Sequence, residues 1–233
     1  MNAGGLILSV NKPLGWTSFD VVNKLRSALR WRSVGHAGTL DPAADGVLIV
    51  LFGNATVRAD EFMALPKVYR ARIRFGVTSP TDDLEGQDLP CQPLADWPLD
   101  HIEYSLRDFV GTIEQLPPAM SAVKVAGRRS YKLARAGQAV DLPPRSVEVY
   151  EARIIQARNP EVDLMIACSR GTYIRAIARD LGRALGWGGL LAALTREAIG
   201  PYRVENTLTT FWWHCSRRTF YGNRAMDCIS LSR

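Results

Sequence analysis

The sequence predicts an α+β fold in which strands outnumber helices and the two kinds of element do not alternate strictly. Two patterns carry this prediction. Apolar and polar residues alternate over 68–75, which is the period of a strand with one buried face. Apolar residues recur every three to four positions over 174–185, as they do in an amphipathic helix. With 233 residues, the chain can bury one large core or two small ones.

The N-terminal elements follow from short signals. Residues 5–10 predict a first strand, and Thr17 or Ser18 can cap the helix that comes next. Its periodic apolar positions are Val21, Val22, Leu25, Ala28 and Leu29. The uninterrupted apolar run 47–52 indicates a buried strand, and a short helix is expected over 55–64, before Pro66.

The alternating segment 68–75 places apolar and basic side chains on opposite faces of one strand. The apolar face carries Tyr69, Ala71, Ile73 and Phe75, and the basic face carries Arg70, Arg72 and Arg74. Tyr69 stands at the strand entrance, where it can line a site at the rim or serve as an ordinary half-buried sheet tyrosine. The acidic stretch 78–100 is interpreted as a long surface loop, followed by a helix over 101–110.

The C-terminal half adds further strands. Residues 146–157 and 161–169 predict two strands joined by Asn159 and Pro160. The amphipathic helix then follows, with Ile174, Ile177, Ala178, Leu181 and Leu185 along its apolar stripe. A short helix at 190–195 and a strand near 197–204 complete the pattern.

Composition and charge narrow the class of protein. The chain is 47% hydrophobic and 22% charged, as in an ordinary globular protein, and it contains no apolar run long enough to span a bilayer. Because the N-terminus has no secretory signal pattern, we expect a cytoplasmic protein without membrane contact. The four cysteines and three histidines show no metal-ligand or disulfide spacing.

The net charge of +6 is unevenly distributed. No Lys or Arg occurs over 76–105, whereas basic residues gather over 12–32, 70–74 and 124–145. This polarity suits a polyanionic partner that docks in one orientation, although basic surfaces also occur in proteins without such a partner.

The loop 35–46 concentrates conformational constraints around one carboxylate, Asp41. Glycines flank it, Pro42 fixes the backbone after it, and His36 lies five positions before it. Spacing by itself favours a structured turn in which Asp41 acts as a cap. The alternative is a rigid catalytic loop, because the segment leads directly into a buried strand.

Residues 115–145 differ in kind from the rest of the chain. Prolines bracket a basic segment, Lys124 to Arg135, which could be an arm that closes on a phosphate backbone or a solvated hairpin. The final stretch 209–233 contains several aromatic residues with no period.

Several separated segments resemble one known family in the correct order, from about residue 5 to about residue 206. These segments are 11–18 (NKPLGWTS), 35–48 (GHAGTLDPAADGVL), 67–70 (KVYR), 118–124 (PAMSAVK) and 168–175 (CSRGTYIR). They are similar to the lysine-proline motif, the catalytic loop, the tyrosine motif, the arm and the arginine motif of the bacterial tRNA pseudouridine-55 synthases, the TruB family.

The resemblance implies a pseudouridine synthase fold: a mixed, mostly antiparallel sheet flanked by helices, with an RNA-binding cleft and a thumb-like arm. It implies that uridine 55 in the TΨC loop of tRNA is isomerised to pseudouridine. Asp41 would be the nucleophile, Tyr69 would stack on the extruded base and could take part in proton transfer, and Arg175 would pair with Asp41. The resemblance also places four residues on the substrate side of the site: His36, Tyr173, Leu194 and Lys12. Lys12 is expected to support the loop rather than to contact RNA.

The implied reaction needs no cofactor, because it involves neither a redox change nor a group donor. The expected partner is the tRNA TΨC stem-loop, with no obligatory protein partner, and the chain is expected to act as a monomer. We expect a catalytic domain over 1–208, with the basic arm at 115–145 inserted, and an atypical tail over 209–233 that leaves no room for a PUA domain. That ending could be natural, a truncation or a shifted reading frame.

Three other functions compete with this one. A non-catalytic tRNA-binding module would require that the Asp41, Tyr69 and Arg175 set be absent or misplaced. A guide-RNA-dependent synthase of the archaeal and eukaryotic kind would act with partner proteins and normally carry a PUA domain. An aspartate-nucleophile hydrolase would call for a D-x-D or metal-binding motif, which the sequence does not contain.

Overall fold

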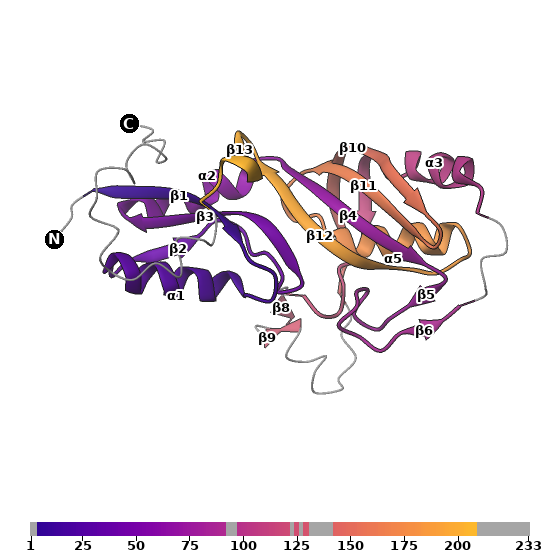
Figure 1. Ribbon diagram of the computed structural model, residues 1–233, viewed down its shortest axis with the longest axis horizontal. Helices are drawn as coiled ribbons and strands as arrows, with labels where there is room; N and C mark the ends of the chain where they lie inside the picture. The colour runs from indigo at the N-terminus through magenta and orange to yellow at the C-terminus, as the bar shows by residue number, and fades with distance from the viewer. Residues whose placement is uncertain (1–3, 92–96, 122–123, 126–127, 131–141, 209–233) are drawn as a thin grey trace. The chain divides into compact units, whose positions relative to one another are not determined.

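The computed structural model describes residues 4–91, 97–121, 124–125, 128–130 and 142–208. They divide into two compact units, Met1–Lys67 with Thr195–Arg233 and Val68–Leu194. Figure 1 labels most of the helices and strands. The predicted tail over 209–233 and residues 131–141 of the predicted arm lie outside the described residues. Within the described part of the chain, no helix combines the length and the apolar character needed to cross a membrane.

The first unit is built on a strand pair that follows the sequence prediction. Strand β1 (Gly5–Lys12) runs antiparallel to β3 (Ala44–Gly53), with Gly5 opposite Gly53 and Lys12 opposite Gly46. Strand β2 (Val34–His36) also pairs with β3, and β12 (Gly189–Ile199) follows β3 in the strand order. A short strand, β13 (Tyr202–Arg203), pairs with the end of β12.

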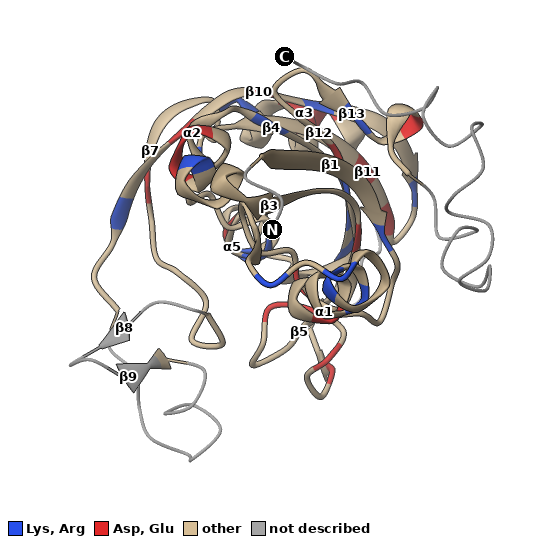
Figure 2. Ribbon diagram, turned by 90° about the vertical axis from the view of Figure 1, so that its left-hand side faces the viewer, with Lys and Arg blue, Asp and Glu red and all other residues tan. Residues whose placement is uncertain are grey.

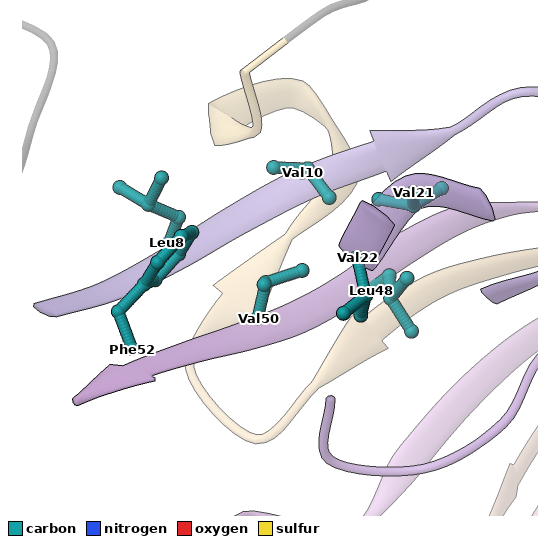
Figure 3. Close-up of a cluster of buried hydrophobic side chains, with 7 residues drawn as sticks. All are labelled: Leu8, Val10, Val21, Val22, Leu48, Val50 and Phe52. Carbon is teal, nitrogen blue, oxygen red and sulfur yellow. The ribbon is translucent and has the colours of Figure 1, made fainter. Parts of the chain in front are cut away.

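Helix α1 (Ser18–Leu29) begins where the sequence predicted. The Thr17 side chain accepts a hydrogen bond from the Asp20 amide at 3.0 Å, and the Asp20 carboxylate accepts one from the Thr17 amide at 2.8 Å. This reciprocal capping box satisfies donors that would otherwise be orphaned at the helix start. The helix buries Val21 and Val22 against the apolar residues of β1 and β3 (Figure 3).

The other helical segments of this unit are short. A 3-10 helix, η1 (Asn54–Arg58), runs into α2 (Ala59–Ala64), as expected for residues 55–64. A second 3-10 turn, η2 (Val204–Asn206), follows β13. The core packed between these segments and β3 includes Phe62 and Ile199.

The second unit contains the strand order β12-β4-β11-β10-β7. Its strands are β4 (Lys67–Phe75), β7 (Gly111–Gln115), β10 (Arg145–Arg158) and β11 (Glu161–Cys168), and its helices are α3 (Leu99–Arg107) and α5 (Ile174–Ala184). Two small hairpins pair β5 (Val77–Thr78) with β6 (Leu89–Pro90) and β8 (Lys124–Val125) with β9 (Arg128–Arg129). The α+β class predicted from the sequence is confirmed.

The alternation predicted for β4 is confirmed by burial. Tyr69, Ala71, Ile73 and Phe75 are buried, while the arginines between them point to the more exposed face. Arg72 pairs in a bidentate manner with Asp163 of β11, at 2.7 and 3.0 Å, and Arg74 pairs with Glu161 at 2.8 Å. These charged pairs tie the outer face of β4 to its neighbour.

Two predictions about this half of the chain are wrong. Residues 190–195 do not form a helix, because they belong to β12, which runs without interruption over Gly189–Ile199. The acidic stretch 78–100 is not a simple surface loop, because it contains the β5–β6 hairpin and buries Asp83, which is 7% exposed. Figure 2 shows acidic residues in red beside β5.

Candidate active site

The Asp41 loop joins β2 to β3 in the first unit and has a fixed backbone. Gly38 and Gly46 adopt φ of 98° and 106°, a region that residues with a Cβ rarely enter. The Ala44 amide donates to the Asp41 carbonyl at 3.0 Å, and the Gly15 amide donates to the Pro42 carbonyl at 2.8 Å. Asp41 itself is partly exposed at the turn.

Side chains from neighbouring elements brace the loop on both sides of Asp41. The Ser18 hydroxyl, at the start of α1, accepts from the Leu40 amide at 2.9 Å and donates to the Leu40 carbonyl at 3.1 Å. The Asn11 side chain accepts from the Gly46 amide at 3.1 Å. The residues around the candidate nucleophile are therefore held by the scaffold.

Lys12 lies beneath this loop with no exposed surface. Its ammonium donates to the carbonyls of Pro13 at 2.9 Å and Trp16 at 2.6 Å. Burial lowers the pKa of Lys12 to about 8, against the opposing influence of Asp45 and Asp41. These contacts hold the 13–16 turn, and that Lys12 supports the Asp41 loop stays a prediction.

Arg196 of β12 is a second buried cation near the loop, and the sequence reasoning missed it. Its guanidinium donates to the carbonyls of Val47 at 2.7 Å, Thr39 at 3.3 Å and Gly38 at 3.2 Å. The sequence does show an arginine within an apolar segment. Because a helix was expected over 190–195, the position of Arg196 in a strand was not recognised.

His36 ends β2 and is partly buried. Burial is the larger cause that lowers the pKa of its imidazole, and the charge of Arg196 lowers it further. The ring is therefore neutral at physiological pH. Its Nδ1 atom is buried and has no hydrogen-bond partner among the described residues.

The second unit contains Tyr69, Tyr173, Arg175 and Leu194. Tyr69 lies on the buried face of β4 with 9% exposure, and Leu194 is a half-buried residue of β12. Tyr173 is the N-cap residue of α5, and its own side chain makes no capping bond. Gln115 at the end of β7 bonds the main chain of Tyr173: its side-chain oxygen accepts from the Tyr173 amide at 2.7 Å, and its side-chain NH2 group donates to the Tyr173 carbonyl at 3.1 Å.

Arg175 is fixed in the first turn of α5 by three groups that sequence reasoning did not identify. It donates to the Asp83 carboxylate at 3.3 Å, to the Thr81 carbonyl at 3.2 Å and to the Met120 carbonyl at 2.9 Å. Asp83 comes from the segment after β5, and Met120 comes from the segment after β7. The position of Arg175 in α5 is therefore fixed by two segments, the one after β5 and the one after β7.

Arg179, one turn further along α5, repeats this arrangement. It pairs with Asp82 at 3.0 Å and donates to the Leu116 carbonyl at 2.9 Å. Burial raises the pKa of the Asp82 carboxyl, and the positive charge of Arg179 opposes that rise. The acidic segment and the base of the predicted arm are therefore both attached to α5.

The predicted arm is described in part. At its base, the Ser130 hydroxyl donates to the Ala119 carbonyl at 2.8 Å and lies 3.1 Å from the Ser121 hydroxyl. Both serines are buried. The interpretation of this segment as an RNA-closing arm stays a prediction.

The structure groups the predicted site residues by unit. Asp41, His36 and Lys12 belong to the first, and Tyr69, Tyr173, Arg175 and Leu194 belong to the second. That the acid, the phenol ring and the guanidinium surround one uracil stays a prediction. Among the described residues, no group of His, Cys, Asp and Glu is arranged to hold a metal ion.

Comparisons with known proteins agree with the motifs. Residues 26–174 match the model of the TruB family pseudouridylate synthase N-terminal domain. The tRNA pseudouridine synthase B of Trichormus variabilis is 47% identical over 205 residues, which cover 87% of this chain and 70% of that protein. The enzyme of the same name from Parabacteroides distasonis is 46% identical over 207 residues, or 86% of this chain and 88% of that protein.

Solved structures give a similar fold at lower identity. A Cbf5–Nop10–Gar1 complex contains a chain with a TM-score of 0.68 and 28% identity, matched over 89% of this chain. An H/ACA ribonucleoprotein bound to a substrate RNA containing 2'-deoxyuridine gives a TM-score of 0.66 and 25% identity over 88% of this chain. The match spans 55% and 51% of the lengths of the two matched chains. From the family match and the identity to these two relatives, this chain belongs to the TruB family of pseudouridylate synthases.

Proposed function

We propose that this chain converts uridine 55 in the TΨC loop of tRNA into pseudouridine, with Asp41 as the nucleophile. The observation that carries the proposal is the Asp41 loop, in which one partly exposed carboxylate is held on a braced backbone. The family membership supports this reaction, because relatives at 46–47% identity are named tRNA pseudouridine synthase B.

The reaction breaks the bond between N1 of uracil and C1′ of ribose, turns the base, and rejoins it through C5. A carboxylate is an adequate nucleophile where a glycosidic bond acquires oxocarbenium character. Since the detached base must be retained, the site needs a stacking platform that excludes water. We assign that platform to Tyr69, because stacking of a base on an aromatic ring contributes about 1–3 kcal/mol.

The target base must leave its stack, at a cost of a few kcal/mol. We assign His36 to the space that the base vacates, because its ring is neutral and is carried on the strand that enters the Asp41 loop. Arg175 is assigned to pair with Asp41, while Tyr173 and Leu194 line the base pocket. A guanidinium beside a carboxylate favours the ionised form and fixes its direction.

The guide-RNA-dependent synthase is the second candidate, because the chain is similar in fold to chains of an H/ACA ribonucleoprotein and of a Cbf5–Nop10–Gar1 complex. This chain is 25–28% identical to those chains, whereas it is 46–47% identical to relatives named for tRNA. The higher identity favours an enzyme that acts on tRNA. We propose in addition that it acts as a monomer, without an obligatory protein partner, in the cytoplasm.

The experiment compares Asp41→Asn with the unchanged chain on an unmodified tRNA transcript, with pseudouridine mapped by carbodiimide treatment and primer extension. We expect the unchanged chain to modify position 55 without any added protein or guide RNA. Asp41→Asn should produce no pseudouridine and retain tRNA affinity. Asp60→Asn, the same change at an exposed position of α2, is the matched control. Turnover by Asp41→Asn would remove Asp41 from its role.

A further inference from the structure

Arg196 is among the largest fully buried side chains of the described residues, with 1% exposure. It extends from β12 to the Asp41 loop, where Nε donates to the Val47 carbonyl and the two Nη atoms donate to the carbonyls of Thr39 and Gly38. Gly38 and Thr39 precede Asp41, and Val47 follows it. One rigid side chain therefore joins the entry of the loop to its exit.

Such a residue is costly if its purpose is stability. Removing a charged group from water costs several kcal/mol, and an apolar side chain of similar volume often replaces a buried ion without loss. Within the described part of the chain, the hydrogen bonds of Arg196 go to main-chain carbonyls and none goes to a carboxylate. Its particular contribution is the geometry that a planar fork of donors imposes on three carbonyls at once.

The backbone of Arg196 constrains the same loop independently of its side chain. A Cβ placed on Gly46 would lie 2.3 Å from the Arg196 carbonyl oxygen and 2.7 Å from the Arg196 nitrogen. Gly46 also has a φ of 106°, which favours glycine. Strand β12 and the end of the loop are therefore in direct contact, so a shift of β12 would also shift the loop.

We infer that Arg196 is a positioning residue for the reaction, which holds the two ends of the Asp41 loop at a fixed separation and so directs the carboxylate. The inference rests on the proposed function of Asp41. It assigns to Arg196 no contact with the substrate. Lysine cannot replace it, because a single ammonium on a flexible stem does not reproduce the planar fork.

The test measures three quantities for Arg196→Lys and Arg196→Gln: the single-turnover rate on tRNA, the tRNA dissociation constant, and the amide hydrogen exchange of the loop. Displacement of a reacting group by about 1 Å can reduce a rate by about 100-fold. We therefore expect both variants to lose about 10–100-fold in rate and to change the dissociation constant by less than about twofold. The amides of Leu40 and Ala44, which are hydrogen-bonded in the loop, should exchange faster than in the unchanged chain.

Val50→Ala is the matched control, because Val50 is fully buried in the core cluster of β1, β3 and α1 and its loss destabilises the same unit. This variant should keep the single-turnover rate at a temperature where it is folded, and its loop amides should stay protected. If the Arg196 variants lose no more rate than Val50→Ala and keep those two amides protected, the inference is wrong. It is also wrong if neither Arg196 variant folds, since Arg196 would then serve the stability of the fold.

The two proposals fail in different ways. If the unchanged chain forms no pseudouridine in tRNA, the proposed function fails. The exchange of Leu40 and Ala44 still decides whether Arg196 holds the loop. If the unchanged chain is active and the Arg196 variants are equally active, only the positioning role fails.

Discussion

Arg175 Nη1 lies 3.3 Å from Asp83 Oδ2, and the two side chains are only 10% and 9% exposed. The carboxylate is itself fixed, because it accepts from the Thr81 hydroxyl at 2.5 Å and from the Glu85 amide at 3.0 Å. A buried guanidinium thus rests on a buried acid that cannot easily move. The acid is 92 positions away in the sequence, and it belongs to a segment that the charge pattern had indicated to be solvent-exposed.

Replacement of Asp83 by alanine should destabilise the protein strongly. Removing one member of a buried ion pair takes a counter-charge away from the other, which typically costs about 3–5 kcal/mol. We expect the free energy of unfolding in urea to fall by about that amount for Asp83→Ala. Asp88→Ala, at an exposed position of the same acidic segment, should change it by less than about 0.5 kcal/mol. A loss below about 1 kcal/mol for Asp83→Ala would mean that the Arg175–Asp83 ion pair contributes no more to stability than an ion pair on the surface does.

The resemblance to the family implies two functions for the Tyr69 side chain, stacking on the base and participation in proton transfer, which substitution can separate. Tyr69→Phe keeps the ring and removes the hydroxyl, so we expect retained tRNA affinity and a slower single-turnover rate. Tyr69→Ala removes the stacking surface and should weaken productive binding of the base by about 1–3 kcal/mol. Tyr150→Phe, at an exposed position of β10, controls for loss of a hydroxyl. An unchanged rate for Tyr69→Phe would restrict Tyr69 to stacking.

Buried Lys12 should give the protein a measurable pH dependence. The pKa of Lys12 is about 8 in the folded chain and 10.5 as the ordinary value, so between these pH values the unfolded chain binds more protons. The unfolding free energy should therefore rise with pH across this range, by up to roughly 3 kcal/mol relative to Lys12→Met.

Urea unfolding of the unchanged chain and of Lys12→Met at several pH values from 8 to 10.5 tests this prediction. Lys24→Met, at an exposed position of α1, is the control for removal of one lysine. Parallel pH profiles for the unchanged chain and Lys12→Met would contradict the assignment of a lowered pKa to Lys12.

Gly46 and Gly35 form a matched pair within one loop segment. A Cβ at Gly46 would collide with the main chain of Arg196, and its φ is positive, whereas a Cβ at Gly35 would meet no atom within 4 Å. Backbone strain and overpacking each cost about 1–3 kcal/mol. We expect Gly46→Ala to lose about 2–6 kcal/mol in unfolding free energy, and Gly35→Ala to lose less than about 1 kcal/mol. Equal losses in thermal or urea unfolding would show that the close approach to β12 is unimportant.

The sequence predicted the elements whose signals are local. The alternation in β4 and the cap at Thr17 each depend on residues a few positions apart, and both are confirmed. The strands β10 and β11 were found because Asn159 and Pro160 mark the turn between them. Such signals need no knowledge of the rest of the chain.

Other features depend on tertiary partners. Residues 190–194 contain leucine and alanine, which favour helices, but β12 has hydrogen-bonded neighbours on both edges, and these distant partners override the local preference. Asp83 and Arg196 were missed for the same reason, since neither a buried acid nor a buried base can be recognised until its partners are known.

The short segment from Gln115 to Ser121 is attached to α5 at three successive points, through Tyr173, Arg179 and Arg175. Ser130 is attached to the same segment, because its hydroxyl is hydrogen-bonded to the carbonyls of Ala119 and Ser121. The contacts that hold the helix carrying Arg175 are therefore made before the peptide between Ser121 and Ser130 begins. A change in the length or charge of that peptide should leave the Arg175 guanidinium in place.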